Sequence, residues 1–134
     1  MKARSKWVEG FRSVLDNGRG HSIVVDLPPD LGGADTGATA LELTVLGLAG
    51  CISTIFALVA KKSRVKFDSL EVLVDAEKGT DIPVKKANVK VIVKTSEPYK
   101  RIKKVLDHTL ANCPVGKIFS KAGTEINVSL EVST

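Results

Sequence analysis

The chain has 134 residues and a net charge of +5, and 43% of its residues are hydrophobic and 26% charged. This length predicts a single domain over residues 1–134, with enough apolar side chains for a core. Only 4% of the residues are aromatic, so few rings are available to stack on bases. The basic clusters are short and interleaved with acids, and we therefore expect no nucleic acid partner. The best surface for one would be the cluster Lys100, Arg101, Lys103 and Lys104.

The first part of the chain predicts a small β-meander followed by an irregular loop. Residues 3–15 mix apolar and polar side chains in the manner of strands, and residues 21–27 form a β-branched strand. Between them, Asn17-Gly18 favours a tight hairpin turn. Prolines and glycines interrupt residues 28–37, so we expect a loop there.

A long apolar run predicts the central helix. Residues 43–60 carry no charge, and the helix should begin near Ala38 or Thr39 and end near Lys61 and Lys62, whose charges suit a C-terminus. This length reaches the threshold for crossing a membrane. Polar residues within the run and the strand-like remainder of the chain favour a helix buried in a fold instead. The charged residues 1–7 lack the apolar stretch of a signal peptide, so we expect a cytoplasmic protein without a membrane span.

The second half predicts further strands and two more helices. Ser96-Glu97-Pro98 predicts a helix start with a capping serine and an early proline. A short third helix should cover residues 114–121 and end at Gly123. Strand-like alternation occurs over residues 67–77, 86–94 and 125–132. This order predicts an α+β fold in which antiparallel sheets cover the long apolar helix.

Cys51 lies inside the long helix, beside Gly47, Ala49 and Gly50. Glycine in a helix costs about 1 kcal/mol relative to alanine, which the close approach of a backbone or ligand would offset. The helix face that carries Cys51 is mostly apolar, so a reactive thiol there would suit an apolar substrate. The alternative is a buried cysteine that acts as a small hydrophobic side chain.

Cys113 precedes Pro114, which disfavours helical geometry at the cysteine and predicts a bend there. If a helix starts at Pro114, its free N–H groups and dipole favour the thiolate of Cys113. The alternative is that Cys113 only completes the apolar stripe of the preceding helix. Two thiols in a small cytosolic protein favour catalysis or redox sensing over a structural disulfide.

A thiolate at Cys51, in apolar surroundings, would need a nearby cation. Arg12 and Arg19, which flank the first hairpin, are the candidates. We expect no metal, because neither His21 nor His108 lies at zinc-ligand spacing from a cysteine or from the other histidine. No phosphate-binding loop and no Ser-His-acid pattern is present.

Several motifs resemble the OsmC/Ohr superfamily of peroxide-defence proteins. They are residues 39–56 with Leu48-Ala49-Gly50-Cys51, and Cys113-Pro114-Val115-Gly116. The start of the chain, with Lys6-Trp7-Val8-Glu9-Gly10 and Gly20-His21-Ser22-Ile23-Val24, resembles the OsmC-like branch. The resemblance implies an intertwined homodimer with long helices buried between two wrapped sheets, active sites at the interface and no bound cofactor.

The resemblance also implies a chemistry. Cys51 would attack an organic hydroperoxide and become a sulfenic acid, Cys113 would condense with it to a disulfide, and an external dithiol would reduce that disulfide. The family uses an arginine and a glutamate to hold the thiolate, for which Arg12, Arg19 and Glu42 are the candidates. Glu42 lies one position after the place of the family's glutamate.

Hydroperoxide reduction in oxidative-stress defence is therefore the leading hypothesis, with small organic hydroperoxides as substrates and hydrogen peroxide as a further candidate. The alternative is a non-catalytic OsmC-like homodimer that binds an apolar ligand or partner.

Overall fold

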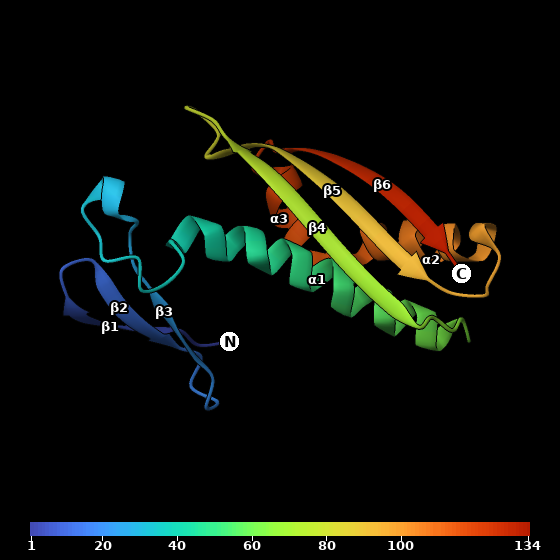
Figure 1. The fold of residues 1–134 in the computed structure, drawn as a ribbon, viewed down its shortest axis with the longest axis horizontal. Helices are drawn as coiled ribbons and strands as arrows, with labels where there is room; N and C mark the ends of the chain where they lie inside the picture. The colour runs from blue at the N-terminus through green and yellow to red at the C-terminus, as the bar shows by residue number, and fades with distance from the viewer. The chain divides into compact units, whose positions relative to one another are not determined.

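The computed structural model describes residues 1–134, and the chain forms two compact units, Met1–Thr44 and Val45–Thr134 (Figure 1). That they act as one domain stays a prediction from the sequence. The elements, in chain order, are β1 (Arg4–Glu9), β2 (Arg12–Asp16), β3 (Ser22–Val25), the short 3-10 helix η1 (Pro29–Leu31), α1 (Ala40–Lys62), β4 (Ser69–Lys78), β5 (Val84–Lys94), α2 (Tyr99–Asn112), α3 (Pro114–Lys121) and β6 (Glu125–Ser133). The predicted α+β class is confirmed.

In the first unit, β1, β2 and β3 form an antiparallel meander in that order, as predicted. The turn between β2 and β3 is longer than the tight hairpin predicted from Asn17-Gly18, because it extends over residues 17–21. The Asn17 side chain accepts the Arg19 backbone N–H at 2.9 Å, and Gly18 and Gly20 have positive φ angles of 73° and 87°. A side chain that bonds its own loop competes with the two-residue turn.

The Asp26 side chain organises the loop that follows β3. This buried carboxylate accepts hydrogen bonds from the Leu27 N–H at 2.8 Å, the Thr36 N–H at 3.1 Å and the Thr36 hydroxyl at 2.6 Å. The Thr36 bonds lower the pKa of Asp26, the hydroxyl contributing most. Residues 28–37, predicted as a loop throughout, contain the short helix η1, and the Asp26 bonds to Leu27 and Thr36 fix both ends of this segment.

In the second unit, one sheet carries three helices on a single face. The strand order is β4-β5-β6, and Figure 1 shows α1, α2 and α3 behind this sheet. β4 pairs with β5 in antiparallel fashion, but β5 and β6 are parallel, so the expectation of purely antiparallel sheets is wrong at this pair. The physical reason is the connection: α2 and α3 cross over the sheet and return the chain to the same end, which makes the next strand parallel.

The core of this unit lies between the inner sheet face and the helices. Alternate β5 side chains and one stripe of α1 at helical spacing are buried, and the Phe56 ring of α1 contacts Phe67 edge-on with centroids 5.7 Å apart. The buried residues of these two elements are Val84, Ala87, Val89, Val91 and Val93 of β5 and Leu48, Ile52, Phe56 and Ala60 of α1.

The helix α1 is buried on this one face only. Leu46 and Leu58 are 58% and 48% exposed, so the single chain covers one side of the helix, and burial of its other side in a homodimer stays a prediction. This unit has a single sheet, which covers only one side of α1. By length and composition α1 also meets the criteria for a helix that crosses a membrane.

The start of α2 differs from its prediction. The helix begins at Tyr99 with Pro98 in the capping position and without a side-chain cap, so Ser96 does not cap it. The Glu97 N–H instead bonds the Thr95 hydroxyl oxygen at 3.0 Å, and that hydroxyl donates to the Lys66 carbonyl at 2.6 Å. The segment before α2 is therefore tied to the segment before β4.

Candidate thiol site

The structure brings the two cysteines together. The Sγ atoms of Cys51 and Cys113 lie 3.1 Å apart, and the Cys113 thiol donates toward the Cys51 sulfur. A disulfide bond is about 2.05 Å long, so both are free thiols in close contact. Cys51 is supplied by the middle of α1 and Cys113 by the junction of α2 and α3. Both belong to the unit Val45–Thr134.

Local sequence signals position Cys113. Its φ of −74° and ψ of 109° are extended, as the following proline predicts, and Pro114 then opens α3 in the first helical turn. The Cys113 sulfur caps this helix by accepting the Gly116 backbone N–H at 3.4 Å. The predicted bend and the predicted third helix are confirmed.

The electrostatic prediction for Cys113 is wrong in direction. Its side chain is buried, with 1% of the residue exposed, and this burial raises the pKa of the thiol above its ordinary value. The hydrogen bond to Cys51 raises the pKa further, while the Gly116 N–H opposes the shift. The dipole argument predicted a favoured thiolate, but loss of hydration outweighs the helix terminus at this depth.

A cavity of about 240 Å³, which we call the Cys113 cavity, lies beside the thiol pair. Cys113 and Gly116 form part of its wall, and Lys117 and Ser120 of α3 lie at its edge. The remaining wall is apolar and consists of Leu48, Ile52, Leu110, Ile126 and Val128. A larger hollow of about 430 Å³ on the sheet has no thiol in its wall. The smaller cavity can bring a small molecule to the Cys113 sulfur.

Glu42 has a defined partner at the start of α1. Its carboxylate accepts the Thr39 backbone N–H at 2.7 Å, and the Thr39 hydroxyl oxygen accepts the Glu42 N–H at 3.1 Å. This reciprocal pair is a capping box. The pattern Thr-x-x-Glu before an apolar run is the sequence signal that predicts such a box, in addition to the catalytic role for which Glu42 is a candidate.

The two candidate arginines lie in the same unit as Glu42, Met1–Thr44. Arg12 pairs with Glu9 across the turn between β1 and β2. Arg19 lies exposed in the turn between β2 and β3. A role of Arg12, Arg19 or Glu42 at the thiols stays a prediction.

Several other residues singled out from the sequence have local partners. The His21 ring bonds the Asn17 amide at 2.9 Å, and no group of three or more potential metal ligands gathers anywhere in the structure. In the basic cluster on α2, Arg101 pairs with Glu97 at 2.6 Å and Lys103 pairs with Asp107. The Lys103–Asp107 pair lies within α2 and is typical of a solvated helix face, whereas the Arg101–Glu97 pair joins the helix to the segment before it.

The sequence matches the OsmC-like protein family over residues 32–129. The chain belongs to this family. The resemblance to the OsmC/Ohr superfamily stated from the sequence motifs is thereby confirmed. No curated protein matches the sequence.

Solved structures of OsmC-like proteins share the fold. An OsmC-like protein from Mycoplasma pneumoniae superposes with a TM-score of 0.87 at 17% identity, covering 99% of this chain and 96% of that one. An organic hydroperoxide resistance protein OsmC from Legionella pneumophila gives 0.71 at 15% identity, covering 99% and 96%. An organic hydroperoxide resistance protein from Elizabethkingia anophelis gives 0.70 at 18% identity, covering 98% and 94%. The family thus includes proteins named for hydroperoxide resistance.

Proposed function

We propose that this OsmC-like protein is a cytoplasmic, cofactor-independent thiol peroxidase that reduces organic hydroperoxides to alcohols in oxidative-stress defence. Cys51 is the peroxidatic thiol and Cys113 the resolving thiol. The observation that carries the proposal is the 3.1 Å separation of the two sulfurs in the reduced protein. Family membership and the names of structural relatives support the same substrate class.

The oxidation half-reaction has two steps. The Cys51 thiolate attacks the distal peroxide oxygen, the O–O bond breaks, and the leaving alkoxide takes a proton to become the alcohol. Cys51 is then a sulfenic acid. The Cys113 sulfur attacks the Cys51 sulfur, the S–O bond breaks, and the hydroxyl group leaves as water with the Cys113 proton. Because the two sulfurs are already in contact, a movement of about 1 Å forms the disulfide bond.

The geometry suits a resolving thiol held in its protonated form. Burial raises the pKa of Cys113, so this thiol keeps its proton until the sulfenic acid forms. The cap bond from the Gly116 N–H holds the sulfur in place at the start of α3. Cys51 is half-buried on α1, which leaves part of the residue accessible to a peroxide.

The decisive experiment counts free thiols and measures intact mass before and after one equivalent of cumene hydroperoxide. We expect the loss of two thiols and of two hydrogen atoms within one chain. Cys51→Ser should abolish the reaction, and Cys113→Ser should leave a sulfenic acid on Cys51 that dimedone traps. Two untouched thiols after peroxide treatment would contradict the proposal.

A second candidate function is a non-catalytic homodimer that binds an apolar ligand. One observation favours it: Glu42 and Arg12, two residues proposed to tune the thiolate, are occupied by Thr39 and Glu9. In that case both thiols would react slowly with cumene hydroperoxide while a hydrophobic fluorescent probe bound tightly.

A further inference from the structure

The Cys113 cavity reaches only one sulfur of the pair. Cys113 contributes to its wall and Cys51 does not, although the two sulfurs are in contact. The cavity is lined by residues of α1, α2, α3 and β6, all within one compact unit. A molecule inside it would therefore approach the pair from the Cys113 side, whereas the half-buried Cys51 has exposed surface outside the cavity.

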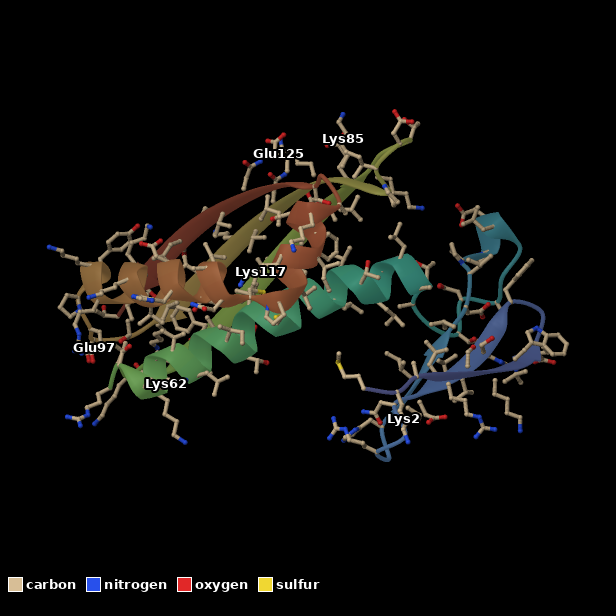
Figure 2. All side chains as sticks on the ribbon, turned by 180° about the vertical axis from the view of Figure 1, so that it is seen from behind. Lys2, Lys62, Lys85, Glu97, Lys117 and Glu125 are labelled. Carbon is tan, nitrogen blue, oxygen red and sulfur yellow. The ribbon has the colours of Figure 1, made fainter.

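The size and walls of the cavity restrict its occupant. A volume of about 240 Å³ lies below the range of drug-sized sites, so it suits a small molecule or the end of a longer chain. Five of its wall residues are apolar, which suits an aliphatic group. Lys117 at its edge is exposed and makes no salt bridge, so its charge is free to attract an anion such as a thiolate (Figure 2).

We propose that the reducing dithiol enters the Cys113 cavity past Lys117 and attacks Sγ of Cys113 in the oxidised protein. Reductant and peroxide then act on different sulfurs of one pair, from different sides. This inference rests on the proposed function, since it concerns the return of the disulfide to two thiols.

Reduction of the disulfide takes two thiol–disulfide exchange steps. One thiolate of a small aliphatic dithiol bonds to the Cys113 sulfur, the Cys51–Cys113 bond breaks, and its electron pair leaves with Cys51 as a thiolate. The second thiol of the reductant loses its proton and attacks the reductant's own sulfur in the mixed disulfide. Cys113 leaves as a thiolate and takes up that proton. The dithiol is oxidised to a cyclic disulfide, and both cysteines are reduced.

The chemistry of Cys113 agrees with this direction of attack. A thiol of high pKa is a poor leaving group, and burial raises the pKa of Cys113. Attack on the Cys113 sulfur makes Cys51 the first leaving group. When Cys113 leaves in the second step, the Gly116 N–H lies 3.4 Å from its sulfur and stabilises the departing charge.

The test uses disulfide that is formed with diamide, so that it does not depend on peroxide reactivity. The oxidised protein is mixed with the anionic monothiol 2-mercaptoethanesulfonate, quenched with acid at short times and mapped by peptide mass spectrometry. We expect the first adduct on Cys113, with Cys51 free for alkylation. A first adduct on Cys51 would overturn the inference.

A matched pair of variants tests the route. Lys117 and Lys121 are exposed lysines of the same helix, without salt bridges, but only Lys117 borders the cavity. We expect Lys117→Glu to slow reduction of the diamide-formed disulfide by dithiothreitol about fivefold or more, and Lys121→Glu to change it by less than about twofold. Equal effects in both variants would refute entry past Lys117. Failure of cumene hydroperoxide to form the disulfide would count against the proposed function and not against this route.

Discussion

At the scale of single residues, the balance between burial and hydrogen bonding sets the direction of the pKa shift of a titratable side chain. Cys113 is an N-cap residue whose thiol would be acidified at an exposed helix terminus, yet burial raises its pKa. Asp26 is also buried, but its three hydrogen bonds lower its pKa. The difference lies in the number of donors: one long bond for the thiol and three short ones for the carboxylate.

The Asp26 bonds make the stability of the first unit depend on pH. Because the pKa of Asp26 is lower in the folded state, its stabilisation is complete above the unfolded-state pKa of about 4 and is lost as the pH falls through the folded-state pKa. We expect Asp26→Asn to lower the thermal unfolding midpoint at pH 7, with a difference from wild type that shrinks in acid. Circular dichroism melts at a series of pH values measure this.

Asp30 provides the control for that experiment. It is exposed in the same loop, so Asp30→Asn should leave the midpoint nearly unchanged at every pH. A difference between wild type and Asp26→Asn that stayed constant from pH 7 into acid would show that the carboxylate charge of Asp26 does not hold the loop.

The residue scale is also where the sequence is least informative about the site. Neither cysteine's local sequence says that the sulfurs meet, because that contact depends on how α1 packs against the junction of α2 and α3. Only the family resemblance suggested that the sulfurs of Cys51 and Cys113 react with each other. Burial of Cys113 agrees with the alternative that it completes the apolar stripe of α2, but its depth also depends on buried side chains of α1 and β5, which are distant from it in the sequence.

At the scale of elements, helix boundaries follow from short-range signals and were largely predictable. Pro114 and Gly123 delimit α3 as expected, since one disfavours helix before it and the other has a positive φ of 91°. The parallel pairing of β5 with β6 was not predictable from the strands. An alternating strand has the same pattern in either direction, and only the path of the connecting helices sets its orientation.

The capping box at the start of α1 should contribute measurably to stability. We expect Thr39→Ala to lower the free energy of unfolding by about 1 kcal/mol, because it removes the acceptor for the Glu42 N–H. Glu42→Gln should cost less, since an amide oxygen can accept the same Thr39 N–H. Urea unfolding followed by circular dichroism measures both changes.

Thr54→Ala is a suitable control in the same helix. The Thr54 hydroxyl only bonds the Gly50 carbonyl one turn back, an interaction that contributes little to helix stability. If Thr39→Ala proved as harmless as Thr54→Ala, the capping box would not stabilise α1.

At the scale of the whole molecule, the exposed apolar face of α1 indicates an interface with another protein chain. Leu46 and Leu58 are large apolar side chains that the single chain leaves exposed, and such surfaces mark interfaces. We propose that a second copy of the chain covers them, in agreement with the homodimer that the family resemblance implies. We expect the protein to sediment as a dimer, and Leu46→Glu to raise the dimer dissociation constant at least about tenfold.

Leu73 offers the comparison for this variant. It is 46% exposed on the outer face of the sheet, where its cross-strand neighbour is Lys90, and this face is polar and solvated. Leu73→Glu should therefore sediment like the wild type. A wild-type protein that remained monomeric at micromolar concentration would contradict the proposal that a second copy covers the apolar face of α1.

The cap bond at the start of α3 has a practical consequence. The Gly116 N–H points at the sulfur that must move about 1 Å when the disulfide forms. Its amide proton therefore senses the redox state directly, and glycine amide signals are readily separated in a nitrogen-15 correlation spectrum. The protein carries its own spectroscopic reporter, so turnover at the thiol pair can be followed in solution without a dye, a tag or an added label on sulfur.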